Sequence, residues 1–258
     1  MATLTADAVD ARSRHIDIDA GTPEHAWQAC DKLATLPQVE LCALVPARSR
    51  AVILAPHPDD EALGCGGLIG MLTTLGRQVS VVAVSDGEGS HPPQSQLHAK
   101  LPELRAGESL AALRRLGLHD AAIRRVRIRD GAVTAHLPEL LKWLHAYLQP
   151  TDILFAPWRL DGHPDHEAVG QAAARMEQDI GCKLVEVPIW TWHWARPDDA
   201  RLPWGRARRL HLTPAAEQNK RLALQCYRSQ IGQDEGRMPV LPAHVLAHFV
   251  RPFEVFFL

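Results

Sequence analysis

The chain has 258 residues, of which 46% are hydrophobic and 22% charged, with a formal net charge of −2 at pH 7. This length suits one large domain or two small ones, and the hydrophobic fraction supplies a full-sized core. The near-neutral charge argues against nucleic acid as a partner, although arginines cluster at residues 124–129 and 201–209. Five cysteines without a C-x-x-C pair, a polar N-terminus and no long apolar stretch predict a reduced, cytoplasmic protein without signal peptide or transmembrane segment.

Strands and helices are predicted to alternate along the chain after a leader of 21 residues. In chain order we expect helix 22–36, strand 51–55, helix 60–75, strand 79–84, helix 102–116, strand 126–128, helix 137–148, strand 152–156, helix 165–180, strands 183–190 and 208–212, helix 214–227 and strand 253–258. The alternation predicts a single-domain, Rossmann-like three-layer α/β fold with a mostly parallel sheet. Residues 1–45 would be an N-terminal leader and helix, and residues 46–258 the catalytic domain.

Charged side chains gather at two places, each directly after a short apolar strand. Residues 55–61 read Ala-Pro-His-Pro-Asp-Asp-Glu, and residues 161–166 read Asp-Gly-His-Pro-Asp-His. Ligands bind beyond the carboxyl ends of the strands in such sheets, so the two clusters are expected to converge there. Burying this much charge is costly without compensation, and a metal ion is the expected compensator.

The two clusters together offer a ligand set for a metal. His57, Asp60 and His166 supply two imidazoles and one carboxylate, a common arrangement for catalytic zinc with a water at the open position. Such a metal would lower the pKa of its water to about 7. Asp59 would be the spare carboxylate beside that water and is predicted to be the general base.

His163 lies three residues before His166 and could stabilise an oxyanion if it is protonated. Asp165 or Asp161 could hold its imidazole in the protonated form. The alternative for either cluster alone is a structural turn, because His-Pro-Asp sequences are common in loops. Two clusters of the same composition, each after a buried strand, favour the metal.

The motifs Pro56-His57-Pro58-Asp59-Asp60-Glu61 and His163-Pro164-Asp165-His166 resemble those of the PIG-L/LmbE-like zinc de-N-acetylase superfamily. Its members remove an N-acetyl group, usually from an N-acetylglucosamine-type sugar. Residues 85–92, the spacing Arg105-x-x-Glu108, and Lys220-x-x-Ala223 followed by Ser229-Gln230 resemble further segments of the family. The resemblance covers residues 50–232.

The resemblance implies that His57, Asp60 and His166 bind Zn²⁺, with Fe²⁺ as an alternative. It makes Asp59 the general base and His163 the group that stabilises the tetrahedral intermediate. These roles agree with those argued from the chemistry of the two clusters. The implied partner is a small-molecule N-acetyl sugar or glycoconjugate, and the oligomeric state stays open, a homo-oligomer included.

Further residues are assigned around this centre. Asp165 is counted with the catalytic residues, and Arg105, Asp161 and His91 are expected to contact the substrate. Some family members have a tyrosine where this chain has Asp161, which leaves open what else polarises the amide. The glycine-rich run 64–67 lacks the lysine of a P-loop and is expected to serve close helix–sheet packing.

Three other interpretations compete with a sugar de-N-acetylase. One is an amidase for a thiol conjugate or a longer acyl chain. The others are a nucleotide- or flavin-binding protein and a carbohydrate-binding module, each with a vestigial metal site. Trp190, Trp192 and Trp194 alternate on a strand-like segment and could stack on a sugar or pack in the core.

Overall fold

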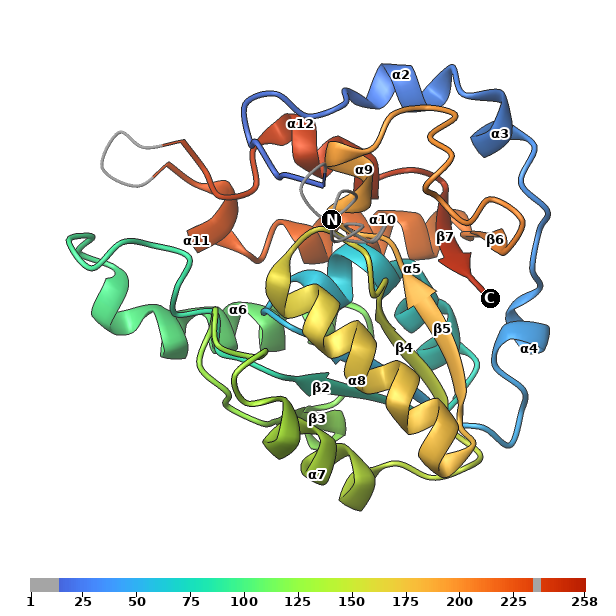
Figure 1. Ribbon diagram of the computed structural model, residues 1–258, viewed down its shortest axis with the longest axis horizontal. Coiled ribbons are helices and arrows are strands. Elements are labelled where there is room, and N and C mark those ends of the chain that lie inside the picture. The colour runs from blue at the N-terminus through green and yellow to red at the C-terminus, as the bar shows by residue number, and fades with distance from the viewer. Residues whose placement is uncertain (1–13, 234–237) are drawn as a thin grey trace, which may run out of the picture.

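The computed structural model describes residues 14–233 and 238–258, and Figure 1 shows a central sheet between layers of helices. Its strand order is β3-β2-β1-β4-β5-β7-β6. The strands are β1 Ala51–Ala55, β2 Val79–Ala83, β3 Ile123–Arg125, β4 Ile153–Pro157, β5 Lys183–Val187, β6 Ala207–His211 and β7 Phe253–Phe257. The pairs from β3 to β5 are parallel, and β7 is antiparallel to β5 and β6. The predicted mostly parallel α/β class is confirmed.

Two hydrophobic cores lie on opposite faces of the sheet, because successive strand residues point to opposite sides. Ile53 of β1 belongs to one core, and Val52 and Leu54 belong to the other. The first core is covered by α5 Asp60–Thr74, α6 Leu101–Arg115 and α10 Pro214–Leu224, and the second by α7 Leu137–Tyr147 and α8 Pro164–Ile180. In Figure 1, α7 and α8 lie in front of the sheet. No helix in the described part of the chain is long and apolar enough to cross a membrane.

The predicted single helix 22–36 is wrong, because the chain forms α2 Glu24–Gln28 and α3 Asp31–Ala34 with a break between them. Trp27 and Leu36 are both buried. At about 100° per residue, one straight helix would turn them to opposite sides. Breaking the helix lets both side chains enter the core.

Other short elements fill the connections. They are α4 Leu41–Leu44, α9 Thr191–Trp194, α11 Arg228–Ile231 and α12 Ala243–Leu246, with 3-10 turns η1 His98–Lys100, η2 Asp120–Ala122 and η3 Ala247–Phe249.

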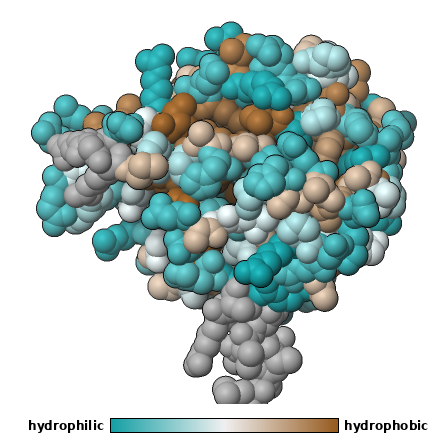
Figure 2. Space-filling view, turned by 90° about the horizontal axis from the view of Figure 1, so that it is seen from above, coloured by the Kyte–Doolittle hydropathy of each residue, from teal (hydrophilic) through white to brown (hydrophobic). Residues whose placement is uncertain are grey.

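Between α2, α3 and residues 247–253 lies a cavity of about 540 Å³. Figure 2 shows hydrophobic side chains gathered in a hollow between hydrophilic ones.

Two predicted strands are displaced or shortened. The strand expected at 126–128 lies at Ile123–Arg125. The chain beyond it still donates from Val126 N to Ala83 O and from Ile128 N to Val84 O, but Arg127 between them has a positive φ of 65°. The segment 189–194 is not a strand, because β5 ends at Val187 and α9 begins at Thr191. The alternation of the tryptophans therefore does not place them on one face of a sheet.

The glycine run 64–67 lies inside α5, where neighbouring groups approach closely. A Cβ at Gly64 would collide with Val187, and one at Gly67 would collide with Leu212. Close packing, as predicted, therefore accounts for these glycines. The buried pair Lys220–Glu254 also contacts this helix: Lys220 Nζ donates to Leu63 O (2.8 Å) and Glu254 accepts from Gly67 N (2.7 Å).

Candidate active site

Both charged clusters lie at the carboxyl ends of neighbouring strands. β1 leads into the loop that carries His57, and β4 leads to His163 at the start of α8. β1 and β4 pair in parallel, with β2 on the other side of β1, so the site lies where the strand order reverses. The ring centre of His57 is 4.9 Å from that of His163 and 5.4 Å from that of His166. The two clusters therefore meet in space.

The donor atoms of the predicted ligands have the spacing that a metal requires. Asp60 Oδ2 lies 3.3 Å from His57 Nδ1 and 3.3 Å from His166 Nε2. Two zinc–ligand bonds of about 2.0–2.1 Å at a tetrahedral angle would place their ligand atoms about 3.3–3.4 Å apart. His166 Nε2 is buried and, within the described part of the chain, makes no hydrogen bond besides this ion-pair contact with Asp60. Both imidazole nitrogens thus lie at ligand spacing from the Asp60 carboxylate, and these three residues fit a divalent metal.

His163 is also close to this point. Nitrogen atoms of His57, His163 and His166 all lie within 4.8 Å of one another, and so do ligand atoms of His57, Asp130 and Asp165, so two other groupings could hold an ion. However, His163 Nδ1 accepts a hydrogen bond from the backbone N–H of Asp165 (3.2 Å). We favour the set with Asp60, because its carboxylate contacts both other ligands and supplies negative charge.

His166 is held by a carboxylate behind it. Its Nδ1 lies 2.9 Å from Asp161 Oδ2, which leaves Nε2 for the metal. Asp161 is fully buried and also accepts the backbone N–H groups of residues 189–191 and the hydroxyl of Thr191. The carboxylate therefore also fixes the turn that leads into α9. The expected substrate contact of Asp161 does not fit, because the side chain is enclosed by these partners.

His57 is supported in the same way, but by two carboxylates. Its Nε2 lies 3.1 Å from Asp130 Oδ1 and 3.3 Å from Asp165 Oδ2. Asp165 in turn accepts the backbone N–H groups of Gly131 (2.7 Å) and Val133 (3.2 Å). The expected role of Asp165 as the partner of His163 is therefore replaced, because its carboxylate faces His57.

The charge balance of the cluster favours a cation. Burial alone would lower the pKa of His166, but Asp60 and Asp161 outweigh it and raise this pKa to about 9. Burial likewise opposes charge on His57, yet Asp130, Asp165 and Asp60 raise its pKa well above its usual value. A metal needs both imidazoles neutral, so its binding is predicted to displace protons.

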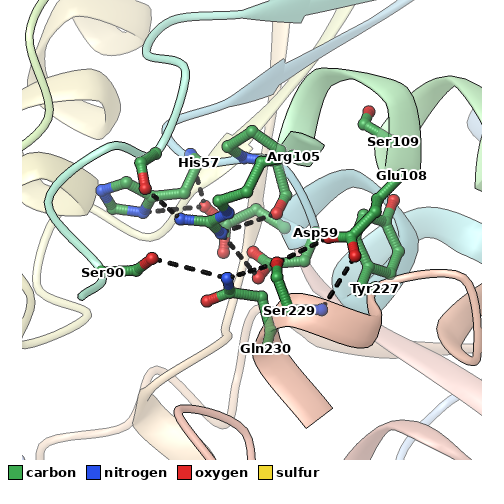
Figure 3. A network of polar contacts seen from close by, with 12 residues as sticks. His57, Asp59, Ser90, Arg105, Glu108, Ser109, Tyr227, Ser229 and Gln230 are labelled. Atoms are coloured by element: carbon green, nitrogen blue, oxygen red, sulfur yellow. Dashed lines mark hydrogen bonds and ion pairs between the residues drawn. The ribbon is translucent and has the colours of Figure 1, made fainter. Parts of the chain in front are cut away.

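Asp59 stands beside the ligands in a strained conformation. Its φ of 139° lies in a region that residues other than glycine rarely adopt. Arg105 holds it there, because Nη2 donates to Asp59 Oδ2 (2.9 Å) and to Pro58 O (2.8 Å), as Figure 3 shows for the carboxylate. Burial raises the pKa of Asp59 to about 7, although Arg105 opposes the rise. A carboxyl that titrates near neutrality suits a general base.

No role was assigned to Glu61 from the sequence, but its carboxylate fixes the backbone of the loop that carries Asp59. Its carboxylate accepts the backbone N–H of Asp59 (3.0 Å) and the hydroxyls of Tyr227 (2.8 Å) and Ser109. Burial raises its pKa, although these hydrogen bonds oppose the rise. The strained backbone at Asp59 is thus fixed by contacts from α6 and from the chain just before α11.

The expectation of a protonated His163 is not supported by its surroundings. Burial, together with the charges of His166 and His57, lowers its pKa to about 3. Neither Asp161 nor Asp165 contacts its ring with a carboxylate oxygen. Because Nδ1 accepts a backbone N–H, the proton of the neutral ring belongs on Nε2. A neutral His163 can still donate one hydrogen bond.

A cavity of about 150 Å³ opens onto these groups. From the predicted site it is lined by His57, Asp59, Asp60, Arg105 and His163. Asp130, Ser90, Gln230, Trp190, Val240 and Leu241 complete much of the wall. His91, expected at the substrate, is buried and outside this lining; its Nδ1 instead lies 2.9 Å from Ser90 Oγ.

Sequence reasoning did not assign Asp130 or Gln230, which both line the cavity. Asp130 follows β3 before Gly131, so its position after a strand was the available signal. Gln230 belongs to the Ser229-Gln230 pair that resembles the family, although its chemistry gave no role. Trp190 alone of the three alternating tryptophans lines the cavity, whereas Trp192 packs edge-on against Trp27 in the core.

Residues 52–177 match the family model described as PIG-L, GlcNAc-PI de-N-acetylase. This match covers just under half of the chain and shows that residues 52–177 are similar to the PIG-L family. The match contains both ligand clusters and excludes residues 178–258, among them Gln230 and the strands β5, β6 and β7.

A curated relative from Bacillus subtilis is named "Probable N-acetyl-alpha-D-glucosaminyl L-malate deacetylase 2". It is 27% identical over 136 residues, which cover 50% of this chain and 60% of that protein. The chain thus matches less than two thirds of the length of this relative.

Solved structures of low identity share the fold. The A40926 pseudoaglycone deacetylase Dbv21 aligns with a TM-score of 0.58 at 20% identity, covering 81% of this chain and 96% of that one. The 4-carboxy-2-hydroxymuconate hydratase GalB of Pseudomonas putida KT2440 aligns with a TM-score of 0.50 at 20% identity, covering 78% and 82%. The same fold is thus found in proteins named for different reactions, and function must be argued from the site.

Proposed function

We propose that this protein is a zinc-dependent de-N-acetylase that releases acetate from an N-acetylglucosamine-type sugar or sugar conjugate. The observation that carries the proposal is that Asp60 Oδ2 lies 3.3 Å from both His57 Nδ1 and His166 Nε2, with Asp59 in the wall of the same cavity. The family match and the name of the Bacillus relative support the sugar amide as substrate.

The residues divide the hydrolysis among them. A divalent metal held by His57, Asp60 and His166 would polarise the amide carbonyl and make a water molecule more acidic. Asp59 takes a proton from the attacking water and later gives it to the leaving nitrogen as the C–N bond breaks. Water is thereby consumed, and acetate and the free amine are the products.

His163 and Arg105 assist without changing their own charge. The Nε2–H of neutral His163 is available to donate a hydrogen bond to the amide oxygen as negative charge develops there. Arg105 orients Asp59 by binding Oδ2 and leaves Oδ1 for the water. Arg105 would thus act through Asp59 rather than as a substrate contact alone.

The size of the cavity favours a short acyl group. About 150 Å³ is below the usual 300–1,000 Å³ of sites that enclose a whole drug-sized ligand. The cavity therefore suits an acetamido group with part of one sugar ring. The remainder of a conjugate would lie outside it, which leaves the aglycone unspecified.

The test is metal reconstitution combined with a substrate panel. The protein is stripped with a chelator, dialysed, and reloaded with Zn²⁺ or Fe²⁺. Release of the free amine and of the matching carboxylate is then measured with N-acetylglucosamine glycosides, their N-butyryl homologues and an N-acyl thiol conjugate. We expect activity only after reloading, with acetyl preferred over butyryl. Equal activity before and after reloading, or a preference for the thiol conjugate, would contradict the proposal.

A further inference from the structure

Gln230 is a fully buried polar residue in the wall of the cavity, contributed by α11. Its backbone carbonyl accepts the N–H of Leu241 (2.9 Å), another residue of the wall. Its side-chain nitrogen Nε2 donates to Ser229 Oγ (2.8 Å) and, more weakly, to Ser90 Oγ (3.4 Å). These contacts fix the side chain at the cavity without involving its carbonyl oxygen.

The orientation of this amide follows from the hydrogen bonds around Ser229. The Glu108 carboxylate accepts the backbone N–H of Ser229 (2.8 Å) at Oε1 and its hydroxyl (2.6 Å) at Oε2. The carboxylate can only accept, so the hydroxyl hydrogen of Ser229 is used there. Ser229 Oγ can then only accept from Gln230, which must present Nε2 to it. The opposite orientation would bring two acceptor oxygens together.

The carbonyl oxygen Oε1 of Gln230 is consequently left over. It is buried and has no hydrogen-bond partner among residues 14–233 and 238–258, and Figure 3 shows contacts from the side-chain nitrogen to Ser90 and Ser229 but none at the oxygen. An unpaired buried acceptor is costly, and each one in a native structure calls for a reason. Neither the metal ligands nor the proposed proton transfers use this atom.

We infer that Gln230 Oε1 recognises the substrate by accepting a hydrogen bond from an O–H or N–H group next to the reacting acetyl. This inference rests on the proposed function and extends it. Gln230 lines the same cavity as Asp59 and His163, so a sugar amide bound there would bring donors close to this acceptor. An acetylated compound without such a donor would leave the acceptor unpaired and be discriminated against.

The experiment compares wild type with Gln230→Met, which keeps the length of the side chain but removes the acceptor. Three acetylated probes are used: methyl N-acetylglucosaminide, its deoxy analogues, and the matching 2-O-acetyl ester, which lacks the N–H. Each kcat/KM of the variant is divided by that of wild type, so the intrinsic reactivity of each probe cancels. Gln225→Met, the same change at an exposed position, is the matched control.

We expect kcat/KM of Gln230→Met to fall about 10-fold on the parent amide. If the donor is the amide N–H, the ester is unaffected. If it is a hydroxyl, amide and ester fall together, and the analogue lacking that hydroxyl does not. An equal fall on every probe, or no fall, would overturn the inference.

A second variant guards against a folding defect. Gln230→Glu retains an acceptor oxygen and, with its carboxyl protonated, donates its hydroxyl to Ser229 Oγ in place of Nε2. In this form it is expected to keep the wild-type ranking of the probes, and loss of that ranking in the folded variant would contradict the inference. Thermal unfolding identifies a variant that does not fold. A wild type inactive on all probes would refute the proposed function as well, whereas uniform losses in an active enzyme refute this inference alone.

Discussion

In both charged clusters, carboxylates contact the histidine that is proposed as a metal ligand, but the two clusters differ in burial and in backbone strain. In the first cluster, His57 is partly open to the cavity, and Asp59 next to it has a φ of 139°. In the second, His166 and its partner Asp161 are both fully buried. The proposed base therefore lies on the strained cluster, whereas the second cluster combines the enclosed pair His166–Asp161 with His163 in the cavity wall.

The difference arises from what stands behind each imidazole. Asp161 is one carboxylate enclosed by backbone donors of a neighbouring segment. Behind His57 stand two carboxylates, Asp130 and Asp165, of which Asp130 also lines the cavity. Removing the one carboxylate behind His166 leaves that imidazole without its partner, whereas removing one of the two behind His57 leaves the other in place. The following predictions test this contrast, from the largest expected effect to the smallest.

Asp59→Asn should lower kcat by about 10²–10⁴-fold, because the amide cannot accept the proton of the attacking water. The metal content should stay unchanged, since Asp59 is not among the three proposed ligands. Steady-state kinetics and elemental analysis of the same preparation check both points. Near-normal turnover would mean that another residue is the general base and that the strained first cluster does not carry the proton transfer.

Asp161→Asn should weaken metal binding by about 10–100-fold, because it removes the support of His166 Nδ1. Asp165→Asn should have a smaller effect, because Asp130 still contacts His57 Nε2. Competition with a chromophoric chelator gives both affinities. If Asp165→Asn weakened metal binding as much as Asp161→Asn or more, the second carboxylate behind His57 would not compensate for the loss of the first.

Tyr227→Phe removes one hydrogen bond to Glu61, the residue that braces the strained loop. We expect a loss of about 1 kcal/mol in the free energy of unfolding, measured by urea denaturation. The loss in kcat should be far below that of Asp59→Asn, because two other donors still hold Glu61. A kcat as low as that of Asp59→Asn would mean that the loop depends on this one hydroxyl.

Glu24 offers a reference outside both clusters. Burial opposes its ionisation, but hydrogen bonds from Arg251 and His248 outweigh it and lower its pKa below the usual 4.5. A lowered carboxyl pKa stabilises the fold above the unfolded value, and this stability is lost as the pH falls through the folded value. Glu24→Gln should therefore cost about 1 kcal/mol at pH 7 and less below pH 4.

The measurement for Glu24→Gln is thermal unfolding of variant and wild type over that pH range. Metal affinity at pH 7 should not change, because Glu24 contacts neither cluster. A cost that rises toward low pH would have the wrong sign and would refute the assigned ion pair.

Local patterns in the sequence were sufficient to predict the α/β class and the meeting of the two clusters. Apolar strands followed by helical periodicity determine such a sheet, and parallel strands bring their carboxyl ends to one edge. The failures concern residues whose structure depends on distant partners. Helix 22–36 breaks so that Trp27 and Leu36 can both be buried, and segment 189–194 turns because Asp161 binds its backbone.

The roles around the metal were harder to predict for the same reason. Asp161, Asp165 and Asp130 could each be suspected of a function from their positions, but which imidazole each one faces depends on the packing of three loops. Spacing along the chain cannot separate a carboxylate that touches a histidine from one that touches substrate. The unpaired oxygen of Gln230 likewise becomes visible only when its hydrogen bonds are traced.

The pair Lys220–Glu254 links the first cluster to the end of the chain. Leu63 O and Gly67 N belong to successive turns of α5, the helix that Asp60 begins, and each is bound by one member of the pair. Glu254 lies in β7, 187 residues from Gly67. The amide hydrogen of Gly67 should therefore exchange with solvent only when α5, α10 and β7 separate together. Strand β7 and Asp60, the proposed metal ligand, then belong to one cooperative unfolding unit, so a substitution that destabilises β7 is expected to weaken metal binding.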